Sequence, residues 1–227
     1  MKASRFMGNM TFAVEDLPVP QAGPGELVVR NKVCGVCGTD VHIYHGEPGS
    51  ADVNPPVVLG HEYSGEVVEV GEGVTGFAVG DHVTIDPNIY CGHCPYCQNG
   101  KKQLCPSMEA IGVTRDGGFA QYSLIPASQA FKLDPTVSWE AAAMAEPLAC
   151  CLHGIDLAGI QAGDKVCVVG GGAIGLIMVQ LAKLSGASKI VLSEPNEKRR
   201  QVGLQLGADA AIDPTQPGCE QAFTQAM

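Results

Sequence analysis

The chain has 227 residues, of which 45% are hydrophobic and 17% are charged, and its formal net charge at pH 7 is -10. This composition is globular, with enough apolar material for one large domain or two ordinary ones. A strongly negative charge argues against nucleic-acid binding, which needs a basic patch. There is neither a membrane-length apolar run nor a signal-like N-terminus, so we expect a cytoplasmic protein without a nucleic-acid or membrane partner.

Residues 1–148 consist of short alternating apolar runs that are separated by Gly and Pro. Three such runs lie at residues 26–30, 65–70 and 81–85. Many short strands joined by tight turns predict a compact β-barrel-like domain.

The composition changes near Ser138, where a segment rich in Ala, Leu and Met begins. Ser138 has the position of a helix N-cap, and Glu140 follows in the first turn. Pro147 interrupts the helical pattern, so we expect two helices that meet at Glu146 and Pro147.

From Lys165 the sequence alternates between strand and helix patterns. Strands are predicted at 165–169, 189–192 and 210–212, and helices at 173–185 and 196–206. This βαβαβ order predicts half of a doubly wound parallel sheet, so the expected fold class is α/β with domains 1–148 and 149–227. The sheet would then be truncated, because the second half of such a fold is absent.

Ten cysteines occur, and four of them form one local cluster. These are Cys91, Cys94, Cys97 and Cys105, separated by two, two and seven residues. Four thiolates at such spacing close around a tetrahedral zinc ion and leave no position for substrate, which predicts a structural zinc site. Free or disulfide-linked cysteines are the alternative, and iron with four thiolates is chemically possible.

A second set of metal-ligating residue types is dispersed along the chain. Cys37, His61, Glu62 and Glu146 offer one thiol, one imidazole and two carboxylates. A mixed shell of this kind can leave one coordination position open, as catalytic zinc requires. The alternatives are a redox pair of Cys34 with Cys37 and a structural histidine.

Residues 170–175 read Gly-Gly-Gly-Ala-Ile-Gly, between a predicted strand and a predicted helix. Gly170, Gly172 and Gly175 fit the glycine-rich turn that holds a dinucleotide pyrophosphate. Glu194 follows the second strand, where an acid can bind the ribose hydroxyls. A carboxylate there favours NAD over NADP, although Arg199 and Arg200 nearby weaken that preference.

With these residues together, the sequence resembles the zinc-containing medium-chain dehydrogenase/reductase family over residues 2–213. It looks most similar to the branch that holds sorbitol, butanediol and threonine dehydrogenases. The resemblance implies a GroES-like catalytic domain, a Rossmann domain and two zinc ions per chain. It also implies that Cys37, His61 and Glu146 hold the catalytic zinc, with Glu62 as an alternative ligand, and that Cys34 only packs.

The resemblance further assigns roles in the reaction. Thr39 would take the substrate proton and His42 would pass it to solvent. The cofactor-binding residues would be Gly170, Gly172, Ala173, Ile174, Gly175, Glu194 and Arg199. Zinc lowers the pKa of a bound alcohol, so an alkoxide could form and pass hydride to NAD.

The predicted function is therefore hydride transfer between a secondary alcohol or polyol and NAD, with a ketone as product. We expect the complete protein to form a homodimer or homotetramer. L-threonine 3-dehydrogenase-like activity is one alternative, and a truncated, non-catalytic zinc-binding fragment is another. A third alternative is a zinc-free quinone reductase of the same fold, but the four clustered cysteines argue against it.

Overall fold

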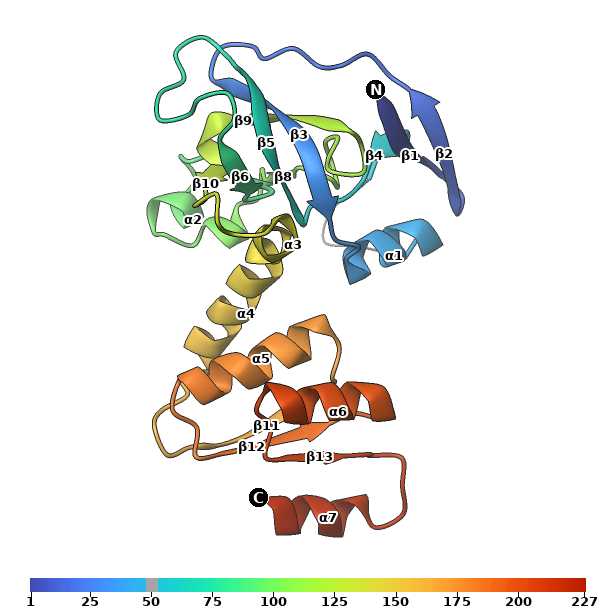
Figure 1. The fold of residues 1–227 in the computed structure, drawn as a ribbon, viewed down its shortest axis with the longest axis vertical. Coiled ribbons are helices and arrows are strands. Elements are labelled where there is room, and N and C mark those ends of the chain that lie inside the picture. Colours follow the sequence, from blue (N-terminus) through green and yellow to red (C-terminus); the bar gives the residue numbers. More distant parts are fainter. Residues whose placement is uncertain (48–52) are drawn as a thin grey trace. The chain divides into compact units, whose positions relative to one another are not determined.

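The computed structural model describes residues 1–47 and 53–227, and Figure 1 shows their ribbon. The chain separates into two compact units, Met1–Glu146 and Pro147–Met227. No helix in these described ranges has both the length and the apolarity needed to cross a membrane.

Antiparallel strands dominate the first unit, as the alternating runs predict. Its largest sheet has the order β10-β6-β5-β3-β9, and two smaller sheets have the orders β2-β1-β4 and β7-β8. The strands are β1 (Lys2–Gly8), β2 (Thr11–Asp16), β3 (Glu26–Cys34), β4 (Val57–Val58), β5 (Tyr63–Val70), β6 (His82–Ile85), β7 (Asn88–Ile89), β8 (Glu109–Ala110), β9 (Tyr122–Pro126) and β10 (Ala130–Lys132). Its helices are α1 (Gly38–His45), α2 (Pro95–Gln98) and α3 (Trp139–Ala143), with 3-10 turns η1 (Lys102–Leu104) and η2 (Ala127–Gln129).

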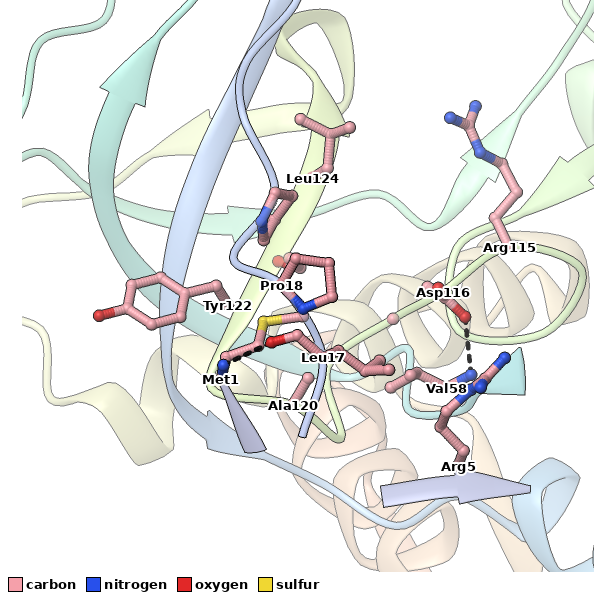
Figure 2. Close-up of a pocket in the computed structure, with 13 residues that line it drawn as sticks. Met1, Arg5, Leu17, Pro18, Val58, Arg115, Asp116, Ala120, Tyr122 and Leu124 are labelled. Atoms are coloured by element: carbon pink, nitrogen blue, oxygen red, sulfur yellow. Dashed lines mark hydrogen bonds between the residues drawn. The ribbon is translucent and has the colours of Figure 1, made fainter. Parts of the chain in front are cut away.

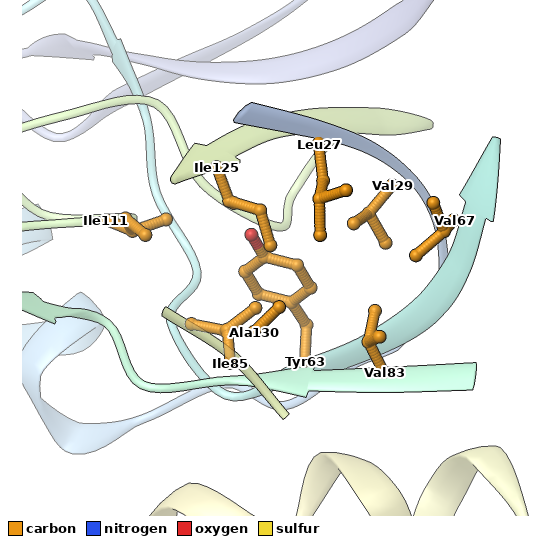
Figure 3. Close-up of a cluster of buried hydrophobic side chains, with 9 residues drawn as sticks. All are labelled: Leu27, Val29, Tyr63, Val67, Val83, Ile85, Ile111, Ile125 and Ala130. Atoms are coloured by element: carbon orange, nitrogen blue, oxygen red, sulfur yellow. The ribbon is translucent and has the colours of Figure 1, made fainter. Parts of the chain in front are cut away.

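The core of this unit lies inside the curved five-stranded sheet. Figure 3 shows the ring of Tyr63 among aliphatic side chains that project inward from several strands. The cluster comprises Leu27, Val29, Tyr63, Val67, Val83, Ile85, Ile111, Ile125 and Ala130. Each fully buried aliphatic side chain of this size stabilises the fold by roughly 1.5–3 kcal/mol, so the barrel is a firm support for the loops at its ends.

The register of β3 against β5 decides which loops meet. The two strands are antiparallel, and Cys34 at the end of β3 is paired with Tyr63 at the start of β5. The segment that follows β3 therefore lies beside the segment that precedes β5. This pairing brings Cys37 close to His61 although 23 residues separate them in the sequence.

The two helices after Ser138 meet three residues earlier than the proline suggested. Ser138 is the N-cap predicted for α3, and its hydroxyl accepts a hydrogen bond from Ala141 N at 3.2 Å. The break falls at Met144, and α4 (Ala145–Ala158) includes Pro147 in its first turn. Proline is tolerated there because the N–H groups of a first turn have no partner within the helix.

The second unit has the predicted βαβαβ order. After α4 it contains β11 (Lys165–Val169), α5 (Ala173–Leu184), β12 (Lys189–Ser193), α6 (Glu197–Leu206), β13 (Ala210–Ile212) and α7 (Cys219–Ala226). The three strands are parallel in the order β11-β12-β13. Helices α5 and α6 lie on one face of this sheet and α7 on the other (Figure 1). Val179 and Ala182 of α5 share a buried cluster with Ile190 and Leu192 of β12.

Candidate functional site

The four clustered cysteines come together around one point. The sulfur atoms of Cys91, Cys94, Cys97 and Cys105 all lie within 4.8 Å of one another, and those of Cys91 and Cys97 are 4.0 Å apart. A tetrahedral zinc ion with bonds of 2.3 Å requires sulfur–sulfur distances of about 3.8 Å. The arrangement thus fits a four-thiolate zinc site with little adjustment.

Backbone N–H groups of the same loop point at these sulfur atoms. Cys94 N donates to Cys91 Sγ, Cys97 N donates to Cys94 Sγ, and Cys91 N donates to Cys105 Sγ, each at 3.4 Å. The N–H groups of His93 and Cys94 lower the pKa of Cys91 to about 6. Hydrogen bonds of this kind stabilise thiolates, which are the form that binds metal. None of the ten cysteines, all within the described ranges, forms a disulfide.

The dispersed residues meet where β3 ends and β5 begins. Ligand atoms of Cys37, His61 and Glu62 lie within 4.8 Å of one another, and His61 is buried. One thiol, one imidazole and one carboxylate provide three zinc ligands and leave the fourth position to a substrate or water. Gly35 leaves room for the Glu62 carboxylate in this position, because a Cβ on it would lie 2.5 Å from Glu62 Oε2.

Asp40, which the sequence pattern did not predict as a site residue, lies next to two of these residues. Cys37 caps helix α1, and its backbone N donates to Asp40 Oδ2 at 2.8 Å. The other oxygen, Oδ1, lies 3.7 Å from His61 Nδ1. A carboxylate behind one ring nitrogen leaves the second nitrogen to a metal ion, as in many zinc sites. The acid three residues after the cap residue was the available sequence signal.

Burial changes the acidity of this pair. Burial raises the pKa of Asp40, which is 3% exposed. For His61 burial acts to lower the pKa, but the hydrogen bond to Cys37 and the charge of Asp40 outweigh it and raise the pKa.

Thr39, His61 and Glu146 line one cavity of about 360 Å³ beside this cluster. The Thr39 hydroxyl lies 3.7 Å from Cys37 Sγ. Glu146 borders the cavity from the first turn of α4, outside the three-residue group formed with Glu62. His42 lies on the exposed side of α1, where its Nδ1 is 2.5 Å from Glu47 Oε2.

Cys34 differs from Cys37 in its surroundings. Its sulfur packs so closely against two glycines that a Cβ on Gly60 or Gly118 would lie 2.8 Å from it. Burial first, and then the charges of Asp40 and Glu62, raise the pKa of Cys34 to about 12. The thiolate that redox chemistry requires is therefore disfavoured at Cys34, and the packing role that the family resemblance implies stays a prediction.

The glycine-rich turn joins β11 to α5 in the second unit. Gly170 has a φ of 96°, and Gly172 is the N-cap of α5, next to Ala173 and Ile174 of its first turn. A Cβ on Gly175 would lie 1.8 Å from Gly170 O, whereas a Cβ on Gly172 would meet nothing within 4 Å. The turn thus leaves open space at the helix N-terminus, where a pyrophosphate binds in dinucleotide folds. Glu194 stands beside it, with Oε2 accepting from Gly171 N at 2.6 Å.

A larger cavity of about 480 Å³ lies elsewhere in the first unit (Figure 2). Leu17, Pro18 and Tyr122 contribute to its wall, and Arg5 and Arg115 contribute charge. None of the predicted site residues is among its lining residues. The smaller cavity is therefore the candidate site, although it is not the most spacious one.

A closed thiolate cluster, an open mixed cluster and a dinucleotide turn are the parts that a zinc-dependent dehydrogenase needs. Known proteins support this class. Residues 23–135 match the alcohol dehydrogenase GroES-like domain, and residues 173–226 match the zinc-binding dehydrogenase family.

Curated relatives and a solved structure cover most of the chain. L-threonine 3-dehydrogenase of Pyrococcus furiosus is 40% identical over 88% of this chain and 57% of its own length. Sorbitol dehydrogenase of Halalkalibacterium halodurans is 42% identical over 91% of this chain and 60% of its own length. A zinc-binding dehydrogenase of Sinorhizobium meliloti 1021, solved with NADP bound, is 47% identical with a TM-score of 0.91, and the match covers 94% of this chain and 62% of that one.

The chain belongs to the zinc-containing medium-chain dehydrogenase/reductase family, and its fold is a GroES-like domain followed by a Rossmann-like part. It spans about 60% of the length of the relatives it matches.

Proposed function

We propose that the complete protein is a zinc-dependent oxidoreductase that moves hydride between a secondary alcohol or polyol and NAD or NADP. The observation that carries the proposal is the cavity lined by Thr39, His61 and Glu146. His61 belongs both to this cavity and to the group with Cys37 and Glu62. A substrate oxygen in the cavity would therefore lie next to the metal ligands.

The residues of the chain supply the proton chemistry. Zinc held by Cys37, His61 and a carboxylate would supply Lewis-acid polarisation of the substrate oxygen. The Thr39 hydroxyl is placed to accept the substrate proton, since it lines the cavity beside Cys37. His42, three residues further on α1 and exposed, offers the next acceptor toward solvent. The carboxylate of Glu146 provides a second proton acceptor in the wall of the same cavity.

The lining of the cavity supports a small polar substrate. Asn88 contributes an amide, whereas Pro87, Met108 and Val113 contribute apolar surface. Such mixed walls suit a short carbon chain with more than one hydrogen-bonding group. L-threonine is the second candidate, because a relative at 40% identity is an L-threonine 3-dehydrogenase.

Two further parts of the proposal concern the cellular location and the oligomeric state of the protein. Cysteines gathered into two metal-ligand clusters suit a reducing compartment, where thiols stay available as ligands, so we propose that the protein is cytoplasmic. A homodimer or homotetramer remains the prediction of the family resemblance.

The proposal is tested with the complete protein and a panel of polyols, vicinal diols and L-threonine, each with NAD or NADP. We expect reduced cofactor, seen by its absorbance, with at least one substrate. Thr39→Ser should retain most of the rate, because the hydroxyl is kept, whereas Thr39→Val should lose at least a hundredfold. A zinc-loaded protein that reduces neither cofactor with any secondary alcohol would refute the proposal.

A further inference from the structure

One polar side chain in the cavity of about 360 Å³ has no part in the proposed reaction. The polar residues that line this cavity in the described part of the chain are Thr39, His61, Asn88, Cys105 and Glu146. Cys105 belongs to the four-thiolate cluster, and Thr39, His61 and Glu146 already have roles in zinc binding or proton transfer. Asn88 is half-buried in the same wall and is left without a role.

The side-chain amide of Asn88 is oriented by Asp86. One carboxylate oxygen, Asp86 Oδ1, accepts from Asn88 N at 2.9 Å and from Asn88 Nδ2 at 3.1 Å. Because the nitrogen end of the amide is bound to Asp86, the oxygen end is the one available to other groups. No residue in the ranges 1–47 and 53–227 donates a hydrogen bond to this oxygen, Oδ1. Asn88 therefore offers the cavity a hydrogen-bond acceptor that the fold leaves free.

Gln129 holds the backbone on one side of this wall. It is 4% exposed, and its Nε2 donates to Asp86 O at 3.1 Å and to Asn88 O at 2.6 Å. In return, Asp86 N donates to Gln129 O at 2.8 Å. These three hydrogen bonds bracket Pro87, which is buried and lines the same cavity. The segment that carries Asn88 is thus fixed to a buried side chain far away in the sequence.

Strand β8 holds the same segment from the other side. Asn88 in β7 is paired with Ala110 in β8, and Ile111 N donates to Pro87 O at 2.9 Å. Ala110 is itself a lining residue of the cavity. A ligand that bonds to a polar group in such a fixed wall loses little free energy to ordering of the protein. The free acceptor of Asn88 is therefore preorganised for binding.

We propose that Asn88 determines substrate specificity, because its amide oxygen accepts a hydrogen bond from a second donor group of the substrate, a hydroxyl or an ammonium group. The inference rests on the proposed function, since it assumes that the reacting alcohol occupies this cavity. Asp86 and Gln129 act as positioning residues for Asn88. A site with a built acceptor discriminates against an analogue that lacks the matching donor, since the acceptor is then left unpaired. The site thus favours diols or amino alcohols over simple secondary alcohols.

Two matched pairs of substrates test this inference on the complete, zinc-loaded protein. 2,3-Butanediol differs from 2-butanol by one hydroxyl, and L-threonine differs from 3-hydroxybutyrate by one ammonium group. The readout is the ratio of kcat/KM within a pair, because differences in folding or zinc content cancel in it. The wild type should favour the member with the second donor at least tenfold in at least one pair. Asn88→Leu, which has a similar shape without the acceptor, should reduce that ratio at least tenfold.

The positioning role of Asp86 has its own readout. Asp86→Asn keeps an oxygen that can accept from Asn88 Nδ2, so the ratio should stay within threefold of the wild type. Asp86→Ala removes that acceptor and lets the amide of Asn88 rotate, so the ratio should fall more than threefold. Asn54→Leu is the matched control, because it makes the same chemical change at an exposed position outside the cavity. It should change the ratio less than twofold.

The outcomes separate this inference from the proposed function. The inference is overturned if the wild type oxidises both members of each pair with equal kcat/KM, or if Asn88→Leu keeps the wild-type ratio. It is also overturned if Asn54→Leu lowers the ratio as much as Asn88→Leu does. Each of these results leaves the proposed hydride transfer standing. If no member of either pair is oxidised, the proposed function itself is wrong, and the inference fails with it.

Discussion

Two glycines of the same turn should respond in opposite ways to the same substitution. A methyl group on Gly175 would lie 1.8 Å from Gly170 O, an atom of the backbone. That backbone cannot move freely, because Gly170 N is bound to Ser193 O at 2.8 Å. A methyl group on Gly172 would meet no atom within 4 Å. The first change therefore tests packing, and the second tests access to the pyrophosphate.

The expected magnitudes follow from these distances. Overpacking typically costs about 1–3 kcal/mol, and a clash with a fixed carbonyl belongs at the upper end, about 3 kcal/mol. For a unit of this size, such a loss lowers the unfolding temperature by roughly 10–20 °C. At Gly172, alanine is the poorer N-cap but restricts the unfolded chain, so the two effects offset each other to within about 1 kcal/mol.

The assay pairs thermal unfolding with nucleotide binding by calorimetry. Gly175→Ala should unfold at a clearly lower temperature. Gly172→Ala should unfold within a few degrees of the wild type and bind ADP-ribose at least tenfold more weakly, because the methyl group occupies the space at the helix N-terminus. Equal unfolding temperatures for Gly175→Ala and the wild type would refute the packing argument. Unchanged binding by Gly172→Ala would refute the placement of the pyrophosphate.

Two further predictions concern buried carboxylates. Asp40→Asn should lower the zinc affinity of the mixed site by about 10–100-fold in a chelator competition, because Asp40 lies next to both Cys37 and His61. Asp134→Asn, at an exposed position, is the control. If Asp40→Asn lost no more zinc affinity than this control, the prediction would be wrong. The pKa of Glu194 lies below its ordinary 4.5, so its stabilising effect should be complete above pH 4.5 and fade as the pH falls through the lower folded value. The stability difference between wild type and Glu194→Gln, measured by urea unfolding, should shrink below pH 4.5, and a difference that grows there would count against it.

Local patterns in the sequence predicted most of the second unit and the four-cysteine cluster. Apolar strands, the glycine turn and Gly207 after α6 are signals within a few residues of the elements they define. The four cysteines lie within a single loop, so their spacing alone indicates a shared ion.

Features that depend on pairing between distant segments were not predictable in the same way. The meeting of Cys37 with Glu62 depends on the register of β3 against β5, which sequence periodicity does not determine. Helix α1 and the role of Asp40 were missed, because eight residues of mixed polarity give no clear helical pattern. One of the two hydrogen bonds that Glu194 accepts comes from the N–H of Gly171, which precedes it by 23 residues, and only the folded turn reveals this bond.

Zinc content of single-cysteine variants tests the central claim, two separate zinc sites, most directly. The wild type should contain two zinc ions per chain by elemental analysis, and Cys37→Ser and Cys91→Ser should each retain one. Cys34→Ser should retain both, because this thiol packs outside either cluster. A folded wild type without zinc, or loss of one ion from Cys34→Ser and none from Cys37→Ser, would contradict the account.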